Sequence, residues 1–315
     1  MNNYIDKEIA LFEKEYFKNI ESGVDLIDKI VKYLCKHKGK MLRPKLAIYA
    51  ANLIDKANDK TYSVASLVEM IHVATLIHDD IVDESYIRRG WPTISKIWKN
   101  KISVLVGDYL FSKALTKTVE LGDLKSISIL SNASDRLSKG EIFQIQQARK
   151  KNMTEKMYFN MISDKTASLF SATCELSART VTTDEEKISS FKKFGENFGI
   201  AYQIKDDIFD IIGKTEDLGK PSNFDLKRNM LTLPLIHCLD SLKSNQKADF
   251  LIHLKSLSKR KKIKEIIFQI NKYDGLDYAK EALDNYIVES KKNISNFPNN
   301  NELISFIDNV FYGKK

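Results

Sequence analysis

The chain of 315 residues is poor in glycine and proline, with 12 and 5 of them. It also has no extended run in which apolar and polar residues alternate strictly, the pattern of half-buried strands. Leu, Ile, Lys, Glu and Ala, most of them good helix formers, dominate the composition instead. These features predict an all-α protein, and a chain of this length can bury a large core.

The three cysteines, Cys35, Cys174 and Cys238, are far apart and odd in number. They lack metal-ligand spacing, so we expect ordinary buried thiols in a reducing compartment. The first residues contain no signal-peptide hydrophobic region, and no apolar stretch reaches the ~18 residues typical of a transmembrane helix. We therefore expect a cytoplasmic protein.

A formal net charge of +8 is a feature found in proteins that bind nucleic acid. Much of this charge, however, comes from Lys scattered among Glu and Asn, with short clusters such as the one at 255–265. The pattern favours a solvated Lys-rich surface, and we expect no nucleic-acid binding. A basic surface can also be weakly attracted to anionic membranes.

The strongest signal is the pentapeptide Asp-Asp-x-x-Asp, which occurs at 79–83 and again at 206–210. Both copies lie in apolar sequence, ATLIHDDIVDES and AYQIKDDIFDIIG, which predicts buried helices. The first and last carboxylates are four residues apart and share a helical face. Like charges at this spacing repel, and burying them unpaired is costly. A solvated acidic face would not have such apolar neighbours, so we interpret both copies as functional.

A cation is therefore expected to bind each group of three carboxylates. Sites rich in carboxylate oxygens suit Mg²⁺. Two such sites on separate helices predict a binding site that encloses a polyanion. A diphosphate is the first candidate for this polyanion. The predicted metal ligands are Asp79, Asp80, Asp83, Asp206, Asp207 and Asp210.

Basic residues accompany the first motif. His72 and Thr75 precede Asp79 by two turns and one turn of helix, on nearly the same face. Arg88 and Arg89 follow in an expected turn, where paired guanidiniums suit a phosphate clamp. Taken alone, the two arginines would be a surface feature and His72 an ordinary helix histidine. Further candidates, which singly could be solvent-facing side chains, are Lys40, Arg43, Lys165 next to Thr166, and Lys220.

The order of apolar and helix-breaking residues predicts a helical chain without a linker, so we expect one domain over 1–315. The strongest loop signal, GKTEDLGKPSNFD, lies at 213–225. Asp123 and Thr154 are predicted N-caps. The predicted helices cover about 3–21, 24–37, Pro44 through the fifties, 62–84, 101–120, 123–150, 154–180 and 184–213, with others from Pro234 to the end.

The motifs and their order resemble the all-trans isoprenyl diphosphate synthases. The long matching segments are IHVATLIHDDIVDESYIRRGWPT and GIAYQIKDDIFDIIG, followed by LGKPSNFDL. The resemblance covers roughly residues 35–235 in order. Shorter matches are Lys40–Pro44, Gly107–Leu110, Gly140 and Glu141 with Gln144, and Lys165–Ala167.

This resemblance implies an all-α fold whose helices surround a deep central cavity, usually in a homodimer. It also implies Mg²⁺-dependent, sequential head-to-tail condensation of isopentenyl diphosphate with an allylic diphosphate. No protein nucleophile is needed, because the double bond of isopentenyl diphosphate attacks the allylic cation left when diphosphate departs. A weak association with membranes would then help to release a lipidic product.

The resemblance also implies roles residue by residue. Asp79, Asp83 and Asp206 are expected to bind the Mg²⁺ ions that chelate the allylic diphosphate, with Asp80, Asp207 and Asp210 supporting them. Isopentenyl diphosphate is expected on Lys40, Arg43, His72 and Arg89. The allylic diphosphate is expected on Arg88, Lys165, Thr166, Gln203 and Lys220. The residues expected to act in catalysis are Asp79, Asp83, Lys165, Gln203, Asp206 and Lys220.

The residues before the first motif bear on product length. A growing apolar tail should pass Ala74 and Thr75, one turn before Asp79, and both are small. In short-product relatives an aromatic residue near this point closes the tunnel. We therefore predict a medium- or long-chain polyprenyl diphosphate, of the size used for quinone side chains. Candidates for the tunnel floor are Ile71, Tyr109 and Phe111.

Some positions depart from the family pattern. Met230 stands where the family usually has a lysine, so a cationic contact is missing or comes from elsewhere, for example Lys227 or Arg228. Three alternatives stay open: a short-chain farnesyl or geranylgeranyl diphosphate synthase, a terpene cyclase, and a non-catalytic regulatory subunit of a heteromeric synthase. The clamp for a second diphosphate argues against a cyclase. The retention of all six aspartates argues against a regulatory subunit.

Overall fold

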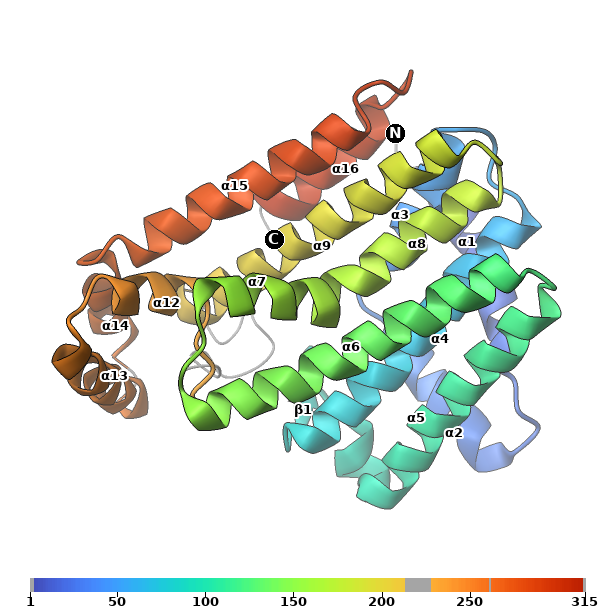
Figure 1. Cartoon of the computed structure of the whole chain (residues 1–315). Helices are drawn as coiled ribbons and strands as arrows, with labels where there is room; N and C mark the ends of the chain where they lie inside the picture. Colours follow the sequence, from blue (N-terminus) through green and yellow to red (C-terminus); the bar gives the residue numbers. More distant parts are fainter. Residues whose placement is uncertain (1–2, 213–227, 261, 314–315) are drawn as a thin grey trace. The chain divides into compact units, whose positions relative to one another are not determined.

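The computed structural model describes residues 3–212, 228–260 and 262–313, and most of these residues are helical (Figure 1). The regular strands in these ranges are β1 (Ile87–Arg88) and β2 (Trp91–Pro92). The all-α prediction is therefore confirmed. None of the helices in these ranges combines the length and the apolarity that a bilayer crossing requires.

Short connections join most neighbouring helices within the described ranges, and a π-helical segment, η1 (Ser163–Ala167), joins two of them. The α-helices are α1 (Asn3–Ile20), α2 (Asp25–Lys36), α3 (Leu42–Asn52), α4 (Asp59–Val82), α5 (Ile94–Glu120), α6 (Leu124–Lys150), α7 (Glu155–Ile162), α8 (Ser168–Arg179), α9 (Glu185–Ile212), α12 (Leu233–Asp240), α13 (Ser244–Lys259), α14 (Ile263–Asn271), α15 (Gly275–Asn293) and α16 (Asn301–Tyr312).

Two compact units make up the chain, and their boundaries fall within α6, α9, α15 and α16 or at the start of α8. Each unit is assembled from separated stretches of sequence. The single domain over 1–315 stays a prediction. Unit 1 consists of Met1–Ser134, Leu169–Gly195 and Asn293–Leu303, and unit 2 of Asp135–Ser168, Glu196–Lys292 and Ile304–Lys315.

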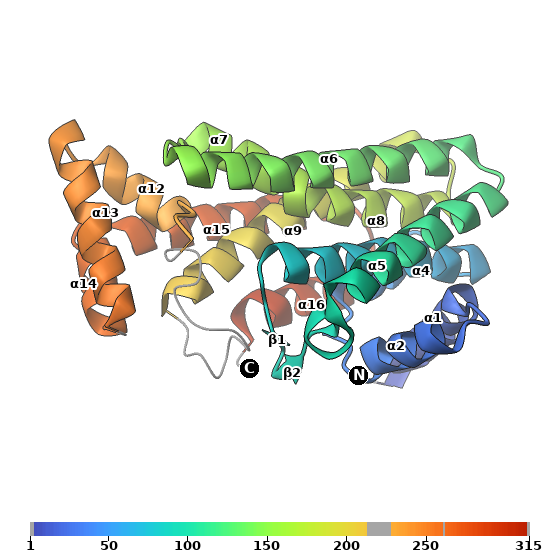
Figure 2. The same cartoon turned by 90° about the horizontal axis from the view of Figure 1, so that it is seen from below.

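Helix α4 is central to unit 1. It begins after Asn58, whose side-chain oxygen accepts hydrogen bonds from the backbone N–H groups of Lys60 and Thr61 at 3.0 and 3.3 Å. It packs against α1, α3 and α5, and Figure 2 shows α4 beside α5. Val68 and Met70 are fully buried, and burying such a side chain contributes roughly 1.5–3 kcal/mol. This buried helix carries the first aspartate motif at its C-terminal end.

The core of unit 2 surrounds the second motif. Helix α12 packs against α7 and α14, and α13 packs against α14. Tyr158, Ile204, Ile208, Leu233 and Leu254 belong to one buried apolar cluster contributed by α7, α9, α12 and α13. One face of the C-terminal half of α9 is therefore buried among apolar side chains, as its sequence predicts, whereas Asp206 on another face is exposed.

Local signals in the sequence are confirmed where the structure describes them. The Asp123 carboxylate accepts two backbone hydrogen bonds, each 3.0 Å long, at the start of α6. The Thr154 hydroxyl accepts one of 3.3 Å at the start of α7. The helix predicted over 154–180 is interrupted by η1, and the loop predicted at 213–225 lies outside the described residues. All three cysteines are free thiols; Cys174 and Cys238 are buried as expected, whereas Cys35 is half-buried, contrary to the expectation.

Candidate active site

The first aspartate motif occupies the last turn of α4 and the residue that caps it. Asp80 is buried, with 7 % of its surface exposed, whereas Asp79 and Asp83 are half-buried. The Nε of Arg88 donates a hydrogen bond of 2.8 Å to Oδ1 of Asp80. Burial raises the pKa of Asp80, and the Arg88 guanidinium opposes this rise. One carboxylate of the trio is thus paired with one of the two predicted clamp arginines.

The segment after α4 forms a short hairpin where the sequence predicted only a turn. Arg88 pairs with Trp91 across antiparallel strands, and Arg89 and Gly90 form the turn with φ of 53° and 79°. Positive φ at both central residues is typical of a type I′ turn. This conformation is unfavourable for arginine, and backbone strain of this kind is frequent at functional sites. The two arginines therefore leave the backbone from different positions, one in a strand and one in the turn.

The segment before α3 meets the hairpin at Gly39. A Cβ atom added to Gly39 would lie 2.3 Å from Nη1 of Arg89, so a side chain at position 39 would require the guanidinium to move. The exposed Lys40 follows, and Arg43 lies in the first turn of α3 with its guanidinium carbon 4.1 Å from the ring centroid of Phe170. The early basic element and the arginine hairpin are thus brought to one place in unit 1.

A basic group surrounds His72 of α4. Burial holds the pKa of His72 well below its ordinary value, and the positive charges of Arg43, Arg89 and Arg88 lower it further. The buried carboxyl of Glu69, one turn earlier, has a raised pKa because of burial, and Arg43 and Arg89 oppose the rise. The guanidiniums of Arg43, Arg88 and Arg89 near His72 create a positive potential that suits an oxyanion.

The second motif lies near the end of α9 in unit 2. Asp206 is exposed, whereas Asp207 and Asp210 are buried. The hydroxyl of Tyr158 and the Nε2 of Gln203 each donate a hydrogen bond of 2.7 Å to the carboxylate of Asp207. Asp207 is therefore held in place by its neighbours, while Asp206 faces solvent where a ligand can reach it.

The predicted Lys165 and Thr166 converge on this motif. The Thr166 hydroxyl donates a 2.6 Å hydrogen bond to Oε1 of Gln203. The Lys165 ammonium is 2.6 Å from a carboxylate oxygen of Glu141 and donates to the side-chain oxygen of Gln144. Lys165, Gln144 and Gln203 line a small pocket in unit 2 together with Asp207 and Met230. Within that pocket the amide of Gln144 donates a 3.4 Å hydrogen bond to the Met230 sulfur.

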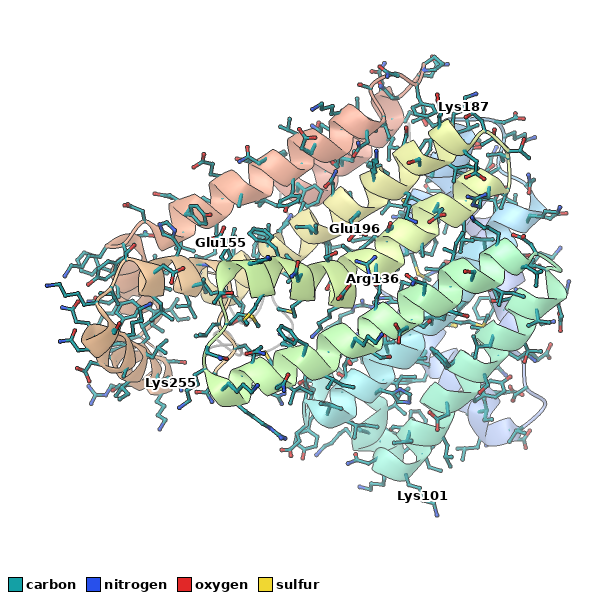
Figure 3. The ribbon with its side chains drawn as sticks, in the orientation of Figure 1. Lys101, Arg136, Glu155, Lys187, Glu196 and Lys255 are labelled. Carbon is teal, nitrogen blue, oxygen red and sulfur yellow. The ribbon has the colours of Figure 1, made fainter. Side chains whose placement is uncertain are left out.

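Lys165 and Thr166 lie in the π-helical segment η1, which α6 supports. The Arg136 guanidinium donates hydrogen bonds of 2.7 Å to Asp164, 2.7 Å to Ser163 and 3.0 Å to Glu196. Figure 3 shows Arg136 of α6 and Glu196 of α9 close together. Such π-helical turns are rare and frequent at functional sites.

Gly140, one turn after Arg136 on α6, allows the backbones to approach. A Cβ atom at Gly140 would lie 2.6 Å from the backbone nitrogen of Lys165. The close approach and the Arg136 hydrogen bonds therefore fix η1, and with it the two side chains that reach the second motif.

The sequence profile of the polyprenyl synthetase family matches residues 24–270. The chain belongs to this family. It is 34% identical to octaprenyl diphosphate synthase of Escherichia coli (strain K12) over 239 residues, which cover 76% of this chain and 74% of that protein. It is 30% identical to heptaprenyl diphosphate synthase component 2 of Bacillus subtilis (strain 168), covering 94% of this chain and 84% of that protein.

Solved structures give the same relationship. The polyprenyl synthase from Caulobacter crescentus CB15, complexed with calcium and isoprenyl diphosphate, superposes with a TM-score of 0.88 at 31% identity, covering 98% of this chain and 95% of that one. The decaprenyl diphosphate synthase from Rhodobacter capsulatus gives 0.89 at 31% identity, covering 98% and 96%. The protein is therefore a trans-prenyltransferase of the medium- or long-chain type, as its motifs predict.

The residues predicted to set product length lie along α4 and α5 of the synthase. Ile71 and Ala74 are fully buried, and the Thr75 hydroxyl donates a 2.8 Å hydrogen bond to the carbonyl of His72. Tyr109 instead reaches the end of α1, where its hydroxyl donates hydrogen bonds of 3.1 Å to two carbonyls. Phe111 is half-buried on α5. Ile71 and Ala74 thus share the buried interior, whereas Thr75 is half-buried and Tyr109 is anchored at α1.

The aspartates of the synthase suit a divalent cation by their donor chemistry, because hard cations prefer carboxylate oxygens. Within the described ranges, no group of three or more His, Cys, Asp or Glu side chains is arranged to hold a metal ion. The two motifs belong to different units, and each contributes its own carboxylates. Lys220, predicted on the allylic side, lies outside the described residues.

Sequence reasoning missed several residues that the structure places beside the predicted ones. Glu69 lies three residues before His72, so its position on the same helical face was a usable signal. Tyr158 and Arg136 are far in sequence from the groups that they contact, and no local pattern pointed to them.

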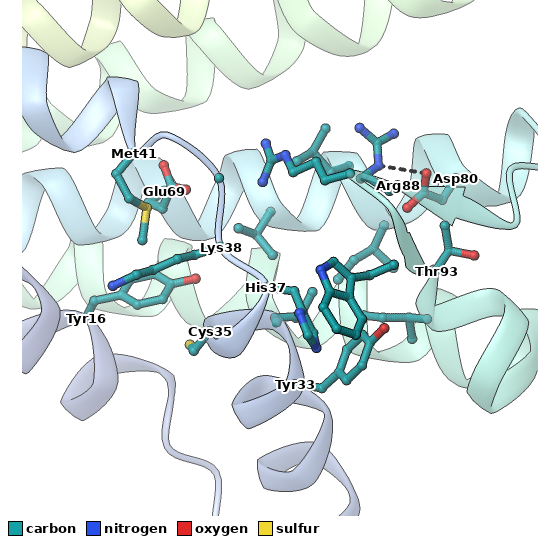
Figure 4. Close-up of a pocket in the computed structure, with 18 of the residues that line it drawn as sticks. Tyr16, Tyr33, Cys35, His37, Lys38, Met41, Glu69, Asp80, Arg88 and Thr93 are labelled. Atoms are coloured by element: carbon teal, nitrogen blue, oxygen red, sulfur yellow. Dashed lines mark hydrogen bonds and ion pairs between the residues drawn. The ribbon is translucent and has the colours of Figure 1, made fainter. Parts of the chain in front are cut away.

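Unit 1 also contains a pocket next to the β1–β2 hairpin that carries Arg88 and Arg89 (Figure 4). Its cavity of about 100 Å³ is lined by apolar side chains of α1, α2 and α4 and by the hairpin. The Tyr33 hydroxyl donates a 2.7 Å hydrogen bond to the carbonyl of Pro92, and the rings of His37 and Trp91 lie 4.0 Å apart. These contacts attach the hairpin that carries Arg88 and Arg89 to α2.

Proposed function

We propose that this synthase uses Mg²⁺ to add isopentenyl diphosphate successively to an allylic diphosphate, producing an all-trans polyprenyl diphosphate for a quinone side chain. The observation that carries the proposal is the group of three guanidiniums around His72 in a helix that ends in an aspartate motif. Guanidiniums beside this helix and carboxylates at its end suit two different ligands. One is a diphosphate held by protein cations, and the other is a diphosphate held through metal ions.

The basic group of unit 1 is assigned to isopentenyl diphosphate. Its members are cationic or can donate N–H hydrogen bonds, and the meeting of Gly39 with Arg89 joins the two segments that carry them. The residues proposed to bind isopentenyl diphosphate are Lys40, Arg43, His72 and Arg89.

The second diphosphate is assigned to the aspartate motifs and their neighbours. Mg²⁺, when bound, would neutralise charge on the allylic diphosphate and favour its departure. The residues proposed to hold the metal are Asp79, Asp83 and Asp206, supported by Asp80, Asp207 and Asp210. The residues proposed to contact the allylic diphosphate are Arg88, Lys165, Thr166, Gln203 and Lys220.

The side chains of the synthase act mainly by charge and position. Arg88 and Lys165 stabilise the negative charge that grows on the leaving diphosphate. The basic group around His72 holds isopentenyl diphosphate so that its double bond lies near the allylic carbon. A proton is then lost to form the new trans double bond, and we assign its removal to the released diphosphate.

We also propose a homodimer that forms through α5. Val104, Leu105, Leu115 and Val119, which follow the kink at Lys99, are between 38% and 61% exposed, and their spacing places them along one side of the helix. An apolar stripe of this length is typical of an interface. A second copy of the chain is its proposed occupant.

The three free thiols are consistent with the proposed cytoplasmic location. A weak association with anionic membrane surfaces would help to release a lipidic product. The name "component 2" of the Bacillus relative implies a further component in that enzyme, so a partner subunit is one outcome that the test must distinguish.

The test is incorporation of labelled isopentenyl diphosphate by the purified full chain, with Mg²⁺ and each allylic primer in turn, followed by measurement of product length. We expect medium- or long-chain products, and a loss of at least roughly 100-fold in kcat for Asp83→Asn and Asp206→Asn. Asp135→Asn, an exposed residue of α6, is the matched control. Products that stop at farnesyl or geranylgeranyl diphosphate would favour the short-chain alternative. Incorporation only after another subunit is added would favour the regulatory one.

A further inference from the structure

The basic charge of the chain is concentrated near its C-terminal third. Residues 252–272 contain seven Lys or Arg and one Glu, a formal charge of +6 out of +8 for the whole chain. The acid, Glu265, is already 2.7 Å from the ammonium of Lys262. The remaining basic residues therefore form an excess that neighbours in this segment do not neutralise.

Two exposed apolar side chains lie among these charges in unit 2. Ile252 of α13 is 66% exposed, and Lys255 and Lys259 follow it at helical spacing on the same face. Phe268 of α14 is 67% exposed, with Lys264 one turn before it and Lys272 one turn after it. Leu254 and Leu257 point inward and are buried. Each helix thus presents one large apolar side chain flanked by lysines.

The lysines of this surface repel one another. Lys255, labelled in Figure 3, donates a hydrogen bond to the side chain of Asn229. Burial lowers its pKa, and the positive charges of Lys151 and Lys259 lower it further. An anionic partner would relieve this repulsion.

We propose that this surface, formed by Ile252, Lys255, Lys259, Lys264, Phe268 and Lys272 and called here the α13–α14 surface, binds anionic lipid bilayers. A basic residue near an anionic leaflet strengthens binding roughly fivefold, and exposed apolar side chains enter the headgroup region. Combining both signals gives reversible attachment to the bilayer surface. Nucleic acid fits less well, because stacking platforms use several aromatic rings and Phe268 is the aromatic member of this surface.

The surface adjoins the small pocket of unit 2. Asn229, the partner of Lys255, is next to Met230, which lines that pocket with Lys165 and Gln203. Delivery of the product to the bilayer from this side rests on the proposed function, whereas binding of the bilayer itself does not.

The test is co-sedimentation of the full chain with vesicles of phosphatidylcholine, with and without phosphatidylglycerol, at low and high salt. We expect binding to the anionic vesicles at low salt and about 25-fold weaker partitioning for the double variant Lys259→Gln, Lys264→Gln, at fivefold for each lysine. The control with the same change of charge is Lys101→Gln, Lys187→Gln, whose lysines are exposed elsewhere and labelled in Figure 3. A second pair compares Ile252→Ser, Phe268→Ser with Ile142→Ser, Val288→Ser, where the exposed fractions are similar.

The outcomes separate the two proposals. Binding that is equal for neutral and anionic vesicles, or lost equally in the control variants, overturns the α13–α14 surface. So does preferential binding of a single-stranded RNA with no response to vesicles. Prenyltransferase activity in detergent is measured on the same samples. Inactive wild type that still binds anionic vesicles would remove the proposed function and leave the surface in place.

Discussion

The thioether sulfur of Met230 accepts a hydrogen bond from the side-chain N–H of Gln144. The side-chain oxygen of Gln144 in turn accepts a hydrogen bond from Lys165. A charged side chain at this place would face the pocket that also contains Gln203 and Asp207. Met230→Lys should therefore lower the KM for the allylic diphosphate by about tenfold, because a hydrogen bond from a charged group contributes about 1.5–3 kcal/mol. Met230→Leu should leave the KM unchanged. Steady-state kinetics with the isopentenyl diphosphate concentration held saturating would measure both, and equal KM values would contradict the prediction.

His72 and Glu69 should make opposite contributions to the pH dependence of stability. Below about pH 6.5 the unfolded chain protonates His72, whereas burial keeps the folded chain from doing so. The free energy of unfolding contributed by His72 therefore falls as pH falls, by up to about 1.36 kcal/mol per pH unit. For Glu69 the raised pKa means that the folded chain keeps a proton which the unfolded chain loses above about pH 4.5, so its contribution falls as pH rises.

Urea unfolding of His72→Gln and Glu69→Gln across this pH range would measure the two effects. His72→Gln should flatten the loss of stability on the acid side, and Glu69→Gln should change the slope in the opposite sense. Slopes that remain as in the wild type would show that neither group titrates differently on folding.

Ala74 offers a test of product length. It is fully buried in α4, one turn before Asp79, so a phenylalanine there must occupy space that the product tail would use. Ala74→Phe should shorten the products, with overpacking costing about 1–3 kcal/mol of stability. Ala74→Ser keeps the volume and should keep the chain-length distribution. Chromatography of labelled products after phosphatase treatment is the measurement, and an unchanged distribution in Ala74→Phe would reject this path for the tail.

Among the elements, η1 has the clearest link between backbone and chemistry. Gly140→Ala places a methyl group against the backbone of Lys165, so η1 must shift. A displacement of about 1 Å can lower rates on the order of 100-fold, and we expect this loss in kcat/KM for the allylic diphosphate. The KM for isopentenyl diphosphate should stay near its wild-type value, because its proposed ligands belong to unit 1.

Substitution of Arg136 provides a second, independent test of how η1 is positioned. Arg136→Gln removes hydrogen bonds to Asp164 and Glu196 and should act in the same direction, with partial recovery in Arg136→Lys. Ser138→Ala, on an exposed part of α6, is the control. Equal losses for both substrates, or a loss that follows only the melting temperature, would indicate a general effect on folding rather than on the position of η1.

Elements differ in how far the sequence predicts them. The starts of α6 and α7 are predictable because Asp123 and Thr154 bond backbone groups within the next turn. The motif helices are predictable because their apolar residues recur at helical spacing. The π-helical turn at η1 and the strands of the hairpin depend on contacts that span many residues, such as Arg136 with Glu196 and Tyr33 with Pro92. No window of local sequence contains both partners.

The candidate site shows the same limit. The aspartates and the basic residues could be named from their types and spacing, and the grouping of Arg43, His72 and Arg89 agrees with the expectation. Glu69 belongs to no motif, and its spacing of three residues from His72 is the one local signal that points to it. The support of Asp207 by Tyr158 was not predictable, because it arises only when α7 packs near α9.

At the scale of the whole molecule, the exposed stripe on α5 makes the state of association testable. Leu105→Glu and Val119→Glu place charges within the stripe and should convert the proposed dimer into monomers, measurable by light scattering after size-exclusion chromatography. Ile252→Glu, equally exposed on α13, should leave the dimer intact. A wild-type chain that is already monomeric, or variants that remain dimeric, would remove α5 as the interface.

The meeting of Gly39 and Arg89 also has an evolutionary consequence. The guanidinium of Arg89 lies so close to the Cα of Gly39 that a methyl group there would displace it. A side chain at position 39 would therefore require the Arg89 side chain to move or to be replaced. Among natural sequences of this family we expect the two sites to co-vary: a side chain at 39 should appear together with a shorter or displaced residue at 89, although the two lie fifty positions apart in the chain.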